Sequence, residues 1–336
     1  MSKSAVRLWG RRVVSVVAVT GLLTGCAPGQ FSTQAQRIGS DDGTDACRPY
    51  LVALDSTGNF FGAQIVTGVA IGALGGAALG GLATGNWRGA AFGALAGGVA
   101  GGATAYWMAL QQQQMDQQAL YQRVSTDLEH ENAAIDKTQT AFDQVTDCRF
   151  HQAQAIRADF RAGRIGRDQA EAAMALVRQR GQRDLQLAQL ISKQIQDRGQ
   201  QFQVAAGNVA PGAGQYAPPP AQPAEVRTAV ALKVRPDPSA PEIAQVRPRE
   251  RVQVAGGRNG YALVETDSGT RGYLPVNELA SPGARRSVQV ASNASVARSG
   301  DIRTLAGSNA ARRDDFAQSV AVTQSAQASG FELAAS

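Results

Sequence analysis

The sequence predicts a chain of several modules in series, mainly helical, with one small all-β barrel and a disordered tail. Three stretches lead to this prediction. Glycine recurs at every fourth position within residues 62–110, a proline-free stretch rich in Gln, Ala and Arg fills residues 111–203, and a valine-rich stretch with frequent turn residues fills residues 225–281. Aromatic residues make up only 6% of the 336 residues, so we do not expect one large core.

Residues 1–25 have the pattern of a secretory signal peptide. Four basic residues precede an apolar run from Val13 to Leu23. The run ends at Leu23-Thr24-Gly25-Cys26, which resembles the lipobox of bacterial lipoproteins. That resemblance implies acylation of Cys26, cleavage before it and, because Ala27 follows, sorting to the outer membrane with the protein facing the periplasm. The alternative is an ordinary signal peptide followed by an unrelated cysteine.

The mature chain is close to neutral. Loss of the four cations of the signal peptide lowers the formal charge from +6 to +2, so the basic composition does not argue for a nucleic-acid partner. After the lipidated cysteine, residues 26–61 are polar and predict a tether with a short helix around residues 50–54.

The glycines of residues 62–110 predict two close-packed helices that cross a membrane. Positions four residues apart form one ridge of a helix, and a ridge without side chains lets another backbone approach closely. These glycines are Gly68, Gly72, Gly76, Gly80, Gly85, Gly89, Gly93, Gly97 and Gly101. Residues 62–84 and 89–110 are each long enough for a bilayer core of roughly 30 Å, with Tyr106 and Trp107 at its interface.

Two further interpretations apply to the same glycines. The helices could stay soluble or pack against each other at a membrane surface. The stretch also resembles the glycine-zipper two-transmembrane segment of surface-antigen-type bacterial lipoproteins, which implies an architecture more than a particular function.

Residues 111–203 predict an antiparallel helical hairpin of the coiled-coil type. Leu128, Ile135 and Phe142 are spaced by seven on its first helix, and the same spacing continues from Met174 to Phe202 on its second. The two glycines within residues 162–168 predict the turn. Such a hairpin is either a spacer or a docking surface for a partner.

Two cysteines, Cys47 and Cys148, remain once Cys26 is lipidated, and an exported protein meets an oxidising compartment, so they are candidates for a disulfide. If residues 62–110 crossed a membrane, a straight helix from residue 110 would carry Cys148 about 57 Å from that membrane. The extended chain from Cys47 to Gly62 would reach at most roughly 50 Å. A bent helix, or an intermolecular bond in a homo-oligomer, would resolve the conflict. His151 lies near Cys148, but two ligands are too few for a structural zinc site, and no metal is predicted.

Residues 204–224 are rich in proline and predict a semi-stiff linker. In residues 225–281, short valine-rich runs alternate with turn signals such as Asn259-Gly260, which predicts a small antiparallel barrel. Residues 282–336 are rich in Ser, Ala, Gly and Arg and predict a low-complexity, mostly disordered tail, with a short helix at about residues 309–327.

Three runs in the barrel, at residues 232–239, 259–264 and 269–274, resemble the opening, central and closing strands of the bacterial Src-homology-3-like (SH3-like) domain. The resemblance implies binding of cell-wall peptides or protein segments in a groove near the first loop. Arg235 and Asp237 would pair with charged groups of the ligand, while Tyr261 and Tyr273 would supply flat apolar contact. The alternative is that both tyrosines are core residues and Arg235 is solvated.

These features together predict a non-enzymatic envelope lipoprotein that binds peptidoglycan or an envelope protein and supports envelope organisation. The alternative is a membrane oligomer, a pore or an assembly component, driven by the glycine ridges. An enzyme has little support, because only His130 and His151 are present and no phosphate-binding loop or nucleophile motif occurs. We therefore predict no catalytic residues and no cofactor.

Overall fold

The computed structural model describes residues 33–62, 102–213, 216–218, 220–294 and 299–331. Within these residues the protein is mainly helical and carries a separate six-stranded antiparallel sheet, which confirms the predicted combination of helices with one small β module. The helices are α1 (Gln34–Ile38), α2 (Arg48–Gly62), α5 (Ala105–Gln111), α6 (Gln117–Arg161), α7 (Arg167–Val209), α8 (Pro282–Ala294) and α9 (Ile302–Gly330). The strands are β1 (Gln222–Glu225), β2 (Val230–Lys233), β3 (Glu242–Val246), β4 (Arg251–Arg258), β5 (Tyr261–Thr266) and β6 (Arg271–Pro275).

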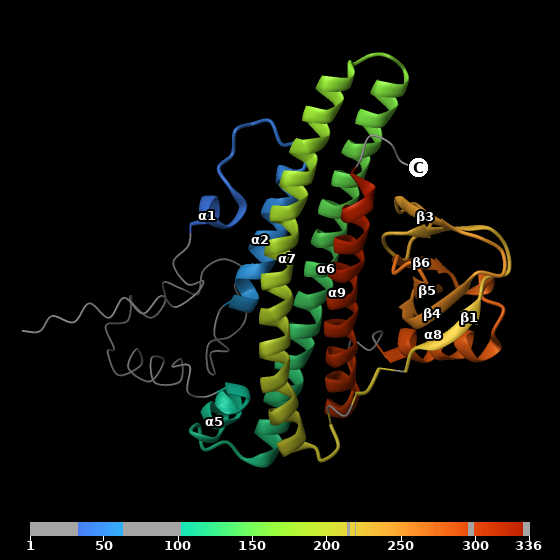
Figure 1. Cartoon of the computed structure of the whole chain (residues 1–336). Coiled ribbons are helices and arrows are strands. Elements are labelled where there is room, and N and C mark those ends of the chain that lie inside the picture. Colours follow the sequence, from blue (N-terminus) through green and yellow to red (C-terminus); the bar gives the residue numbers. More distant parts are fainter. Residues whose placement is uncertain (1–32, 63–101, 214–215, 219, 295–298, 332–336) are drawn as a thin grey trace, which may run out of the picture. The chain divides into compact units, whose positions relative to one another are not determined.

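The long helices α6 and α7 pack side by side (Figure 1). The Asp116 carboxylate caps α6 by accepting a hydrogen bond from the Ala119 N–H at 2.8 Å, and the helix ends before Gly163, which has a φ of +69°. The stripe of Leu128, Ile135 and Phe142 is buried, as is the stripe from Met174 to Phe202. Seven-residue periodicity therefore marks the faces that these helices bury.

The C-terminal region differs from its sequence-based prediction. Residues 282–336 are predicted to be a low-complexity tail with a short helix at about residues 309–327. In the structure that helix is part of the longer α9, which packs against both α6 and α7, and α8 covers the sheet (Figure 1). Glycines on α7 allow this close approach. A Cβ on Gly199 would lie 2.3 Å from the side chain of Arg313 on α9, and one on Gly181 would lie 3.1 Å from Phe331.

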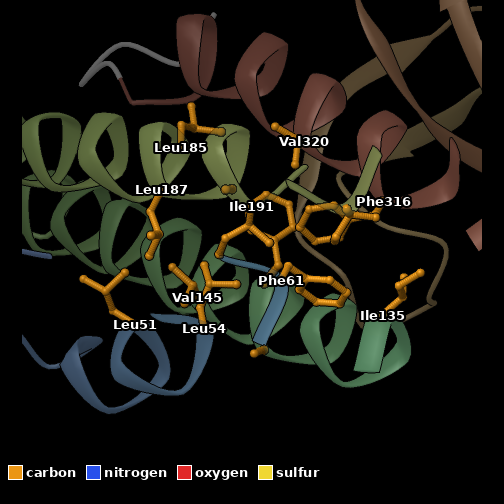
Figure 2. Packing of buried hydrophobic residues seen from close by; sticks show 14 of the residues in the cluster. Leu51, Leu54, Phe61, Ile135, Val145, Leu185, Leu187, Ile191, Phe316 and Val320 are labelled. Carbon is orange, nitrogen blue, oxygen red and sulfur yellow. The ribbon is translucent and has the colours of Figure 1, made fainter. Parts of the chain in front are cut away.

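The region expected to be a tether also belongs to the helical core. Helix α2 packs against α6 and α7, and its Leu51, Leu54 and Phe61 are buried among residues from all three long helices (Figure 2). Gly58 gives room for this contact, because a Cβ there would lie 2.6 Å from Ile191 of α7. The Arg37 side chain of α1 pairs with the buried Asp55 carboxylate at 2.6 Å and ties the loop between α1 and α2 to this core.

The prediction of membrane-spanning helices in residues 62–110 is corrected. Within the described ranges, no helix combines the length and the apolar character needed to cross a bilayer. The glycine ridge from Gly68 to Gly101 lies outside the described residues. Tyr106, expected at a membrane interface, is instead 1% exposed on α5, where its ring lies 5.0 Å from that of Phe202 and its hydroxyl donates to Asp127 at 2.7 Å.

The structure contains an intrachain disulfide between Cys47 and Cys148, with their Cα atoms 5.8 Å apart. The sequence-based estimate placed the two cysteines too far apart, because α6 was expected to lead straight away from the segment that carries Cys47. Helix α2 instead packs along α6, so the chain just before α2 lies beside the C-terminal half of α6, where Cys148 is (Figure 1). The bond joins two positions that are 101 residues apart in the sequence.

The sheet has the strand order β1-β4-β5-β6-β2-β3, with antiparallel pairing throughout. Asn259 and Gly260 form the two-residue turn between β4 and β5, both with positive φ, as the sequence signal predicted. Ala284 and Val288 of α8 pack against the buried residues of the sheet and complete its hydrophobic core. Helix α9 contacts β3 and β6, which places the sheet against the long helices.

Candidate functional site

The four residues predicted to bind a ligand, two in strands and two in the loop after β2, lie where the β module faces the long helices. Arg235, just after β2, pairs with Asp147 of α6 at 2.7 Å and with Asp237 at 3.2 Å. Asp237 is held by the Ser239 hydroxyl and N–H, which lower its pKa. The structure thus brings Arg235 and Asp237 together, but the guanidinium of Arg235 is already engaged by a helix of the same chain.

The two tyrosines are part of a shared apolar cluster. Tyr273 is 2% exposed and lies among residues of the sheet, α6, α7 and α9, while Tyr261 is partly buried against the same cluster. Leu263 and Tyr273 face each other across the β5–β6 pair. Both tyrosines therefore contact this chain's own core, as in the alternative interpretation of these residues.

Arg258, at the end of β4, makes a second polar contact between the sheet and the helices. Its guanidinium donates to the Ser319 hydroxyl of α9 at 2.9 Å and to the Gln139 side chain of α6 at 3.3 Å. Burial raises the pKa of the nearby Asp143, although the charges of Arg258 and Arg235 oppose this shift. Sequence reasoning missed Arg258, because neither α6 nor α9, which supply its partners Gln139 and Ser319, was expected to pack against the sheet.

We expect Arg235 and Asp147 to stabilise the docked sheet by about 1 kcal/mol, since the pair is partly shielded from solvent. A double-mutant cycle with Arg235→Gln and Asp147→Asn, measured by urea unfolding, would give this coupling energy. The matched control is the Arg271–Glu265 pair within the sheet, whose side chains are 48% and 40% exposed and whose coupling should be below about 0.5 kcal/mol. Equal coupling in the two pairs would contradict the expectation.

A second polar site is a cavity of about 170 Å³ between the loop before α2 and the surface of α7. Four arginines and four aspartates contribute to its lining. The most buried of them is Arg149, which follows Cys148 in the sequence. Its side chain is only 1% exposed. It pairs with Asp45 at 2.6 Å and with Asp184 at 2.6 Å, so one cation bridges the loop and α7.

The pKa values of the two carboxylates that bind Arg149 are shifted in opposite directions. Burial raises the pKa of Asp184, and the hydrogen bonds from Arg149 only partly offset this effect. Burial also acts on the pKa of Asp45, but hydrogen bonds from Arg149 and the Cys47 N–H outweigh it and lower that pKa. The sequence offered a weak signal for this network, since Asp45 and Arg149 each lie next to or near a cysteine of the disulfide pair.

The described residues hold no group of three or more His, Cys, Asp or Glu side chains that could bind a metal ion. His130 and His151 are exposed, and Cys148 is disulfide-bonded.

No protein-family model, curated protein or solved structure matches this chain. Its function has to be inferred from its own residues.

Proposed function

We propose that the protein is a non-enzymatic lipoprotein of the bacterial envelope, anchored by acyl chains on Cys26 and facing the periplasm. The observation that carries the proposal is the use of its three cysteines. Cys26 ends a lipobox-like sequence, and the other two form a disulfide, which persists in oxidising compartments outside the cytoplasm. Both features are expected of an exported lipoprotein.

In this proposal the mature chain acts as a scaffold with a binding module. The disulfide, the Arg149 network and the packing of α2, α6, α7 and α9 support a rigid helical body. The six-stranded sheet would be an SH3-like module that binds peptidoglycan or an envelope protein, in support of envelope organisation. Asp237, which pairs with Arg235, is 41% exposed. It is the most exposed of the four residues predicted to bind a ligand.

Acylation is tested by the variant Cys26→Ser. The parent should incorporate a palmitate label and fractionate with membranes, because several acyl chains give stable anchoring. The variant should lose the label and leave the membrane fraction. If the variant keeps both, the lipoprotein assignment is wrong.

Ligand binding is tested by retention of the full mature chain on purified peptidoglycan sacculi. We expect retention, and we expect Asp237→Asn to reduce it severalfold, since a charged hydrogen bond to the ligand is lost. Asp267→Asn, in the exposed turn between β5 and β6, is the matched control and should bind as the parent does. Absence of retention would exclude peptidoglycan and leave an envelope protein as the ligand to be sought by crosslinking.

A further inference from the structure

The cavity beside the disulfide contains charged groups that the Arg149 network leaves available. Arg48 and Arg183, together with Asp41 and Asp42, take no part in the Arg149 pairs. The remaining arginine of the lining, Arg180, lies 3.9 Å from Asp42 and 3.9 Å from Asp45. The first four of these residues come from the loop before α2, from the start of α2 and from α7. They therefore surround the cavity from two sides that are far apart in the sequence.

Arg48 has one buried donor without a partner. Its terminal nitrogens donate to the carbonyl oxygens of Ile38 at 2.9 Å and Gly39 at 2.7 Å, which fixes the guanidinium. Its Nε atom is buried and has no hydrogen-bond acceptor among the described residues. Because Nε has almost no accessible surface, a ligand in the cavity would meet the Nη hydrogens of Arg48 that the two carbonyl bonds leave over.

Arg183 is the second available cation. It forms no hydrogen bond or ion pair with the described residues, and its charge opposes the rise that burial causes in the pKa of the neighbouring Asp184. Its guanidinium lies over Gly39, where a Cβ would come within 2.9 Å of Nη1, and Gly39 has a φ of +79° that favours glycine. The backbone of the loop thus leaves room for this arginine at the cavity.

Asp41 and Asp42 are the anions outside the Arg149 pairs, and the loop fixes both. Asp42 also lies 3.9 Å from Arg180 through its Oδ1 atom. Asp41 accepts from the Gly43 N–H at 3.0 Å, and Asp42 accepts from the Thr44 N–H at 2.9 Å and the Thr44 hydroxyl at 2.8 Å. The bonds from Thr44 lower the pKa of Asp42, so this carboxylate stays ionised at neutral pH. In each aspartate only Oδ1 makes these bonds, which leaves Oδ2 to receive another donor.

We propose that this cavity binds a small zwitterion with a carboxylate and an ammonium group on one carbon: a free α-amino acid, or a peptide side chain that ends in the same pair of groups. Arg48 and Arg183 would bind the carboxylate, and Asp41 and Asp42 would bind the ammonium group. A simple anion would meet the two aspartates, and a simple cation would meet the two arginines. The volume of about 170 Å³ is far above the roughly 10–15 Å³ that one water needs, so it admits such a ligand.

Isothermal titration of the full mature chain in detergent with alanine tests the proposal. N-acetylalanine lacks the ammonium group, alaninamide lacks the carboxylate, and acetate carries only the anion. We expect saturable binding of one alanine per chain and at least about tenfold weaker binding of the other three, because each loses charged hydrogen bonds. Absence of saturable binding, or acetate binding as tightly as alanine, would overturn the proposal.

Variants of the cavity supply the second test. Arg183→Gln and Asp42→Asn should each weaken alanine binding by about fivefold or more, while leaving the circular dichroism spectrum unchanged. Asn at position 42 still accepts from the Thr44 N–H. Arg167→Gln, at a 74% exposed position on the same helix, is the matched control and should bind as the parent does. Unchanged affinity in both cavity variants would overturn the proposal, whatever the palmitate and sacculus experiments show.

Discussion

Replacement of Arg149 by methionine is expected to lower the free energy of unfolding by about 3–5 kcal/mol. The arginine is 1% exposed and bridges Asp45 and Asp184, each at 2.6 Å. Methionine has a similar length but leaves the deeply buried Asp184 without its ion pair, and leaves Asp45 with the more distant Arg180, at 3.9 Å. Urea unfolding of the mature chain, followed by circular dichroism, measures the loss.

Two further variants separate the charge effect from packing. Arg164→Met removes an arginine that is 61% exposed and paired with Asp159, and should change stability by less than about 1 kcal/mol. Adding Asp45→Asn and Asp184→Asn to Arg149→Met should recover a large part of the loss, because no uncompensated charge remains. A single variant as stable as the parent would show that Arg149 does not hold the loop to α7.

The elements that the sequence predicted correctly are those whose signals are local. Leu128, Ile135 and Phe142 repeat by seven, and such a repeat can bury a stripe only if the segment is helical. Asn259-Gly260 marks a two-residue hairpin because both positions require positive φ. These conclusions need no knowledge of which segment packs against which.

The full length and the packing of the third long helix escaped prediction, because the helix buries polar residues. Only a short helix at about residues 309–327 was expected within it. Arg312 of α9 is 5% exposed and pairs with Asp136 of α6 at 2.8 Å, and Asn309 donates to Asn132 at 3.0 Å. A helix with such a buried face lacks the apolar stripe by which helices are recognised, so its sequence has the composition of a disordered tail. Its stability depends on partners that are more than 170 residues away.

The cavity was missed for the same reason. Thr44 of its loop and Arg180 of α7 are 136 residues apart, and apart from the cysteine near Asp45 no residue type or spacing in either segment indicates a site. The four residues predicted to bind a ligand show the opposite case. They were chosen because their sequence resembles an SH3-like domain. In the structure they contact α6 and α9, which lie outside the part of the chain that the resemblance covers.

Removal of the disulfide by Cys47→Ser with Cys148→Ser is expected to cost about 4–5 kcal/mol of unfolding free energy. The bond closes a loop between positions 101 residues apart, and the restriction that a disulfide places on the unfolded chain grows with loop length. Thermal and urea unfolding of the variant and of the parent, in the absence of reductant, measure the difference.

The competing interpretation is an intermolecular bond between the same cysteines, and it predicts different results. An intrachain bond leaves the parent monomeric on a denaturing, non-reducing gel, and the single variant Cys47→Ser should then lose stability as the double variant does. A covalent dimer that disappears on reduction would contradict the intrachain bond. Arg149 follows Cys148 and binds Asp45, which lies two residues before Cys47, so the ion pair and the disulfide restrain the same loop. A variant that combines Arg149→Met with both cysteine substitutions should therefore lose less stability than the sum of the two separate losses.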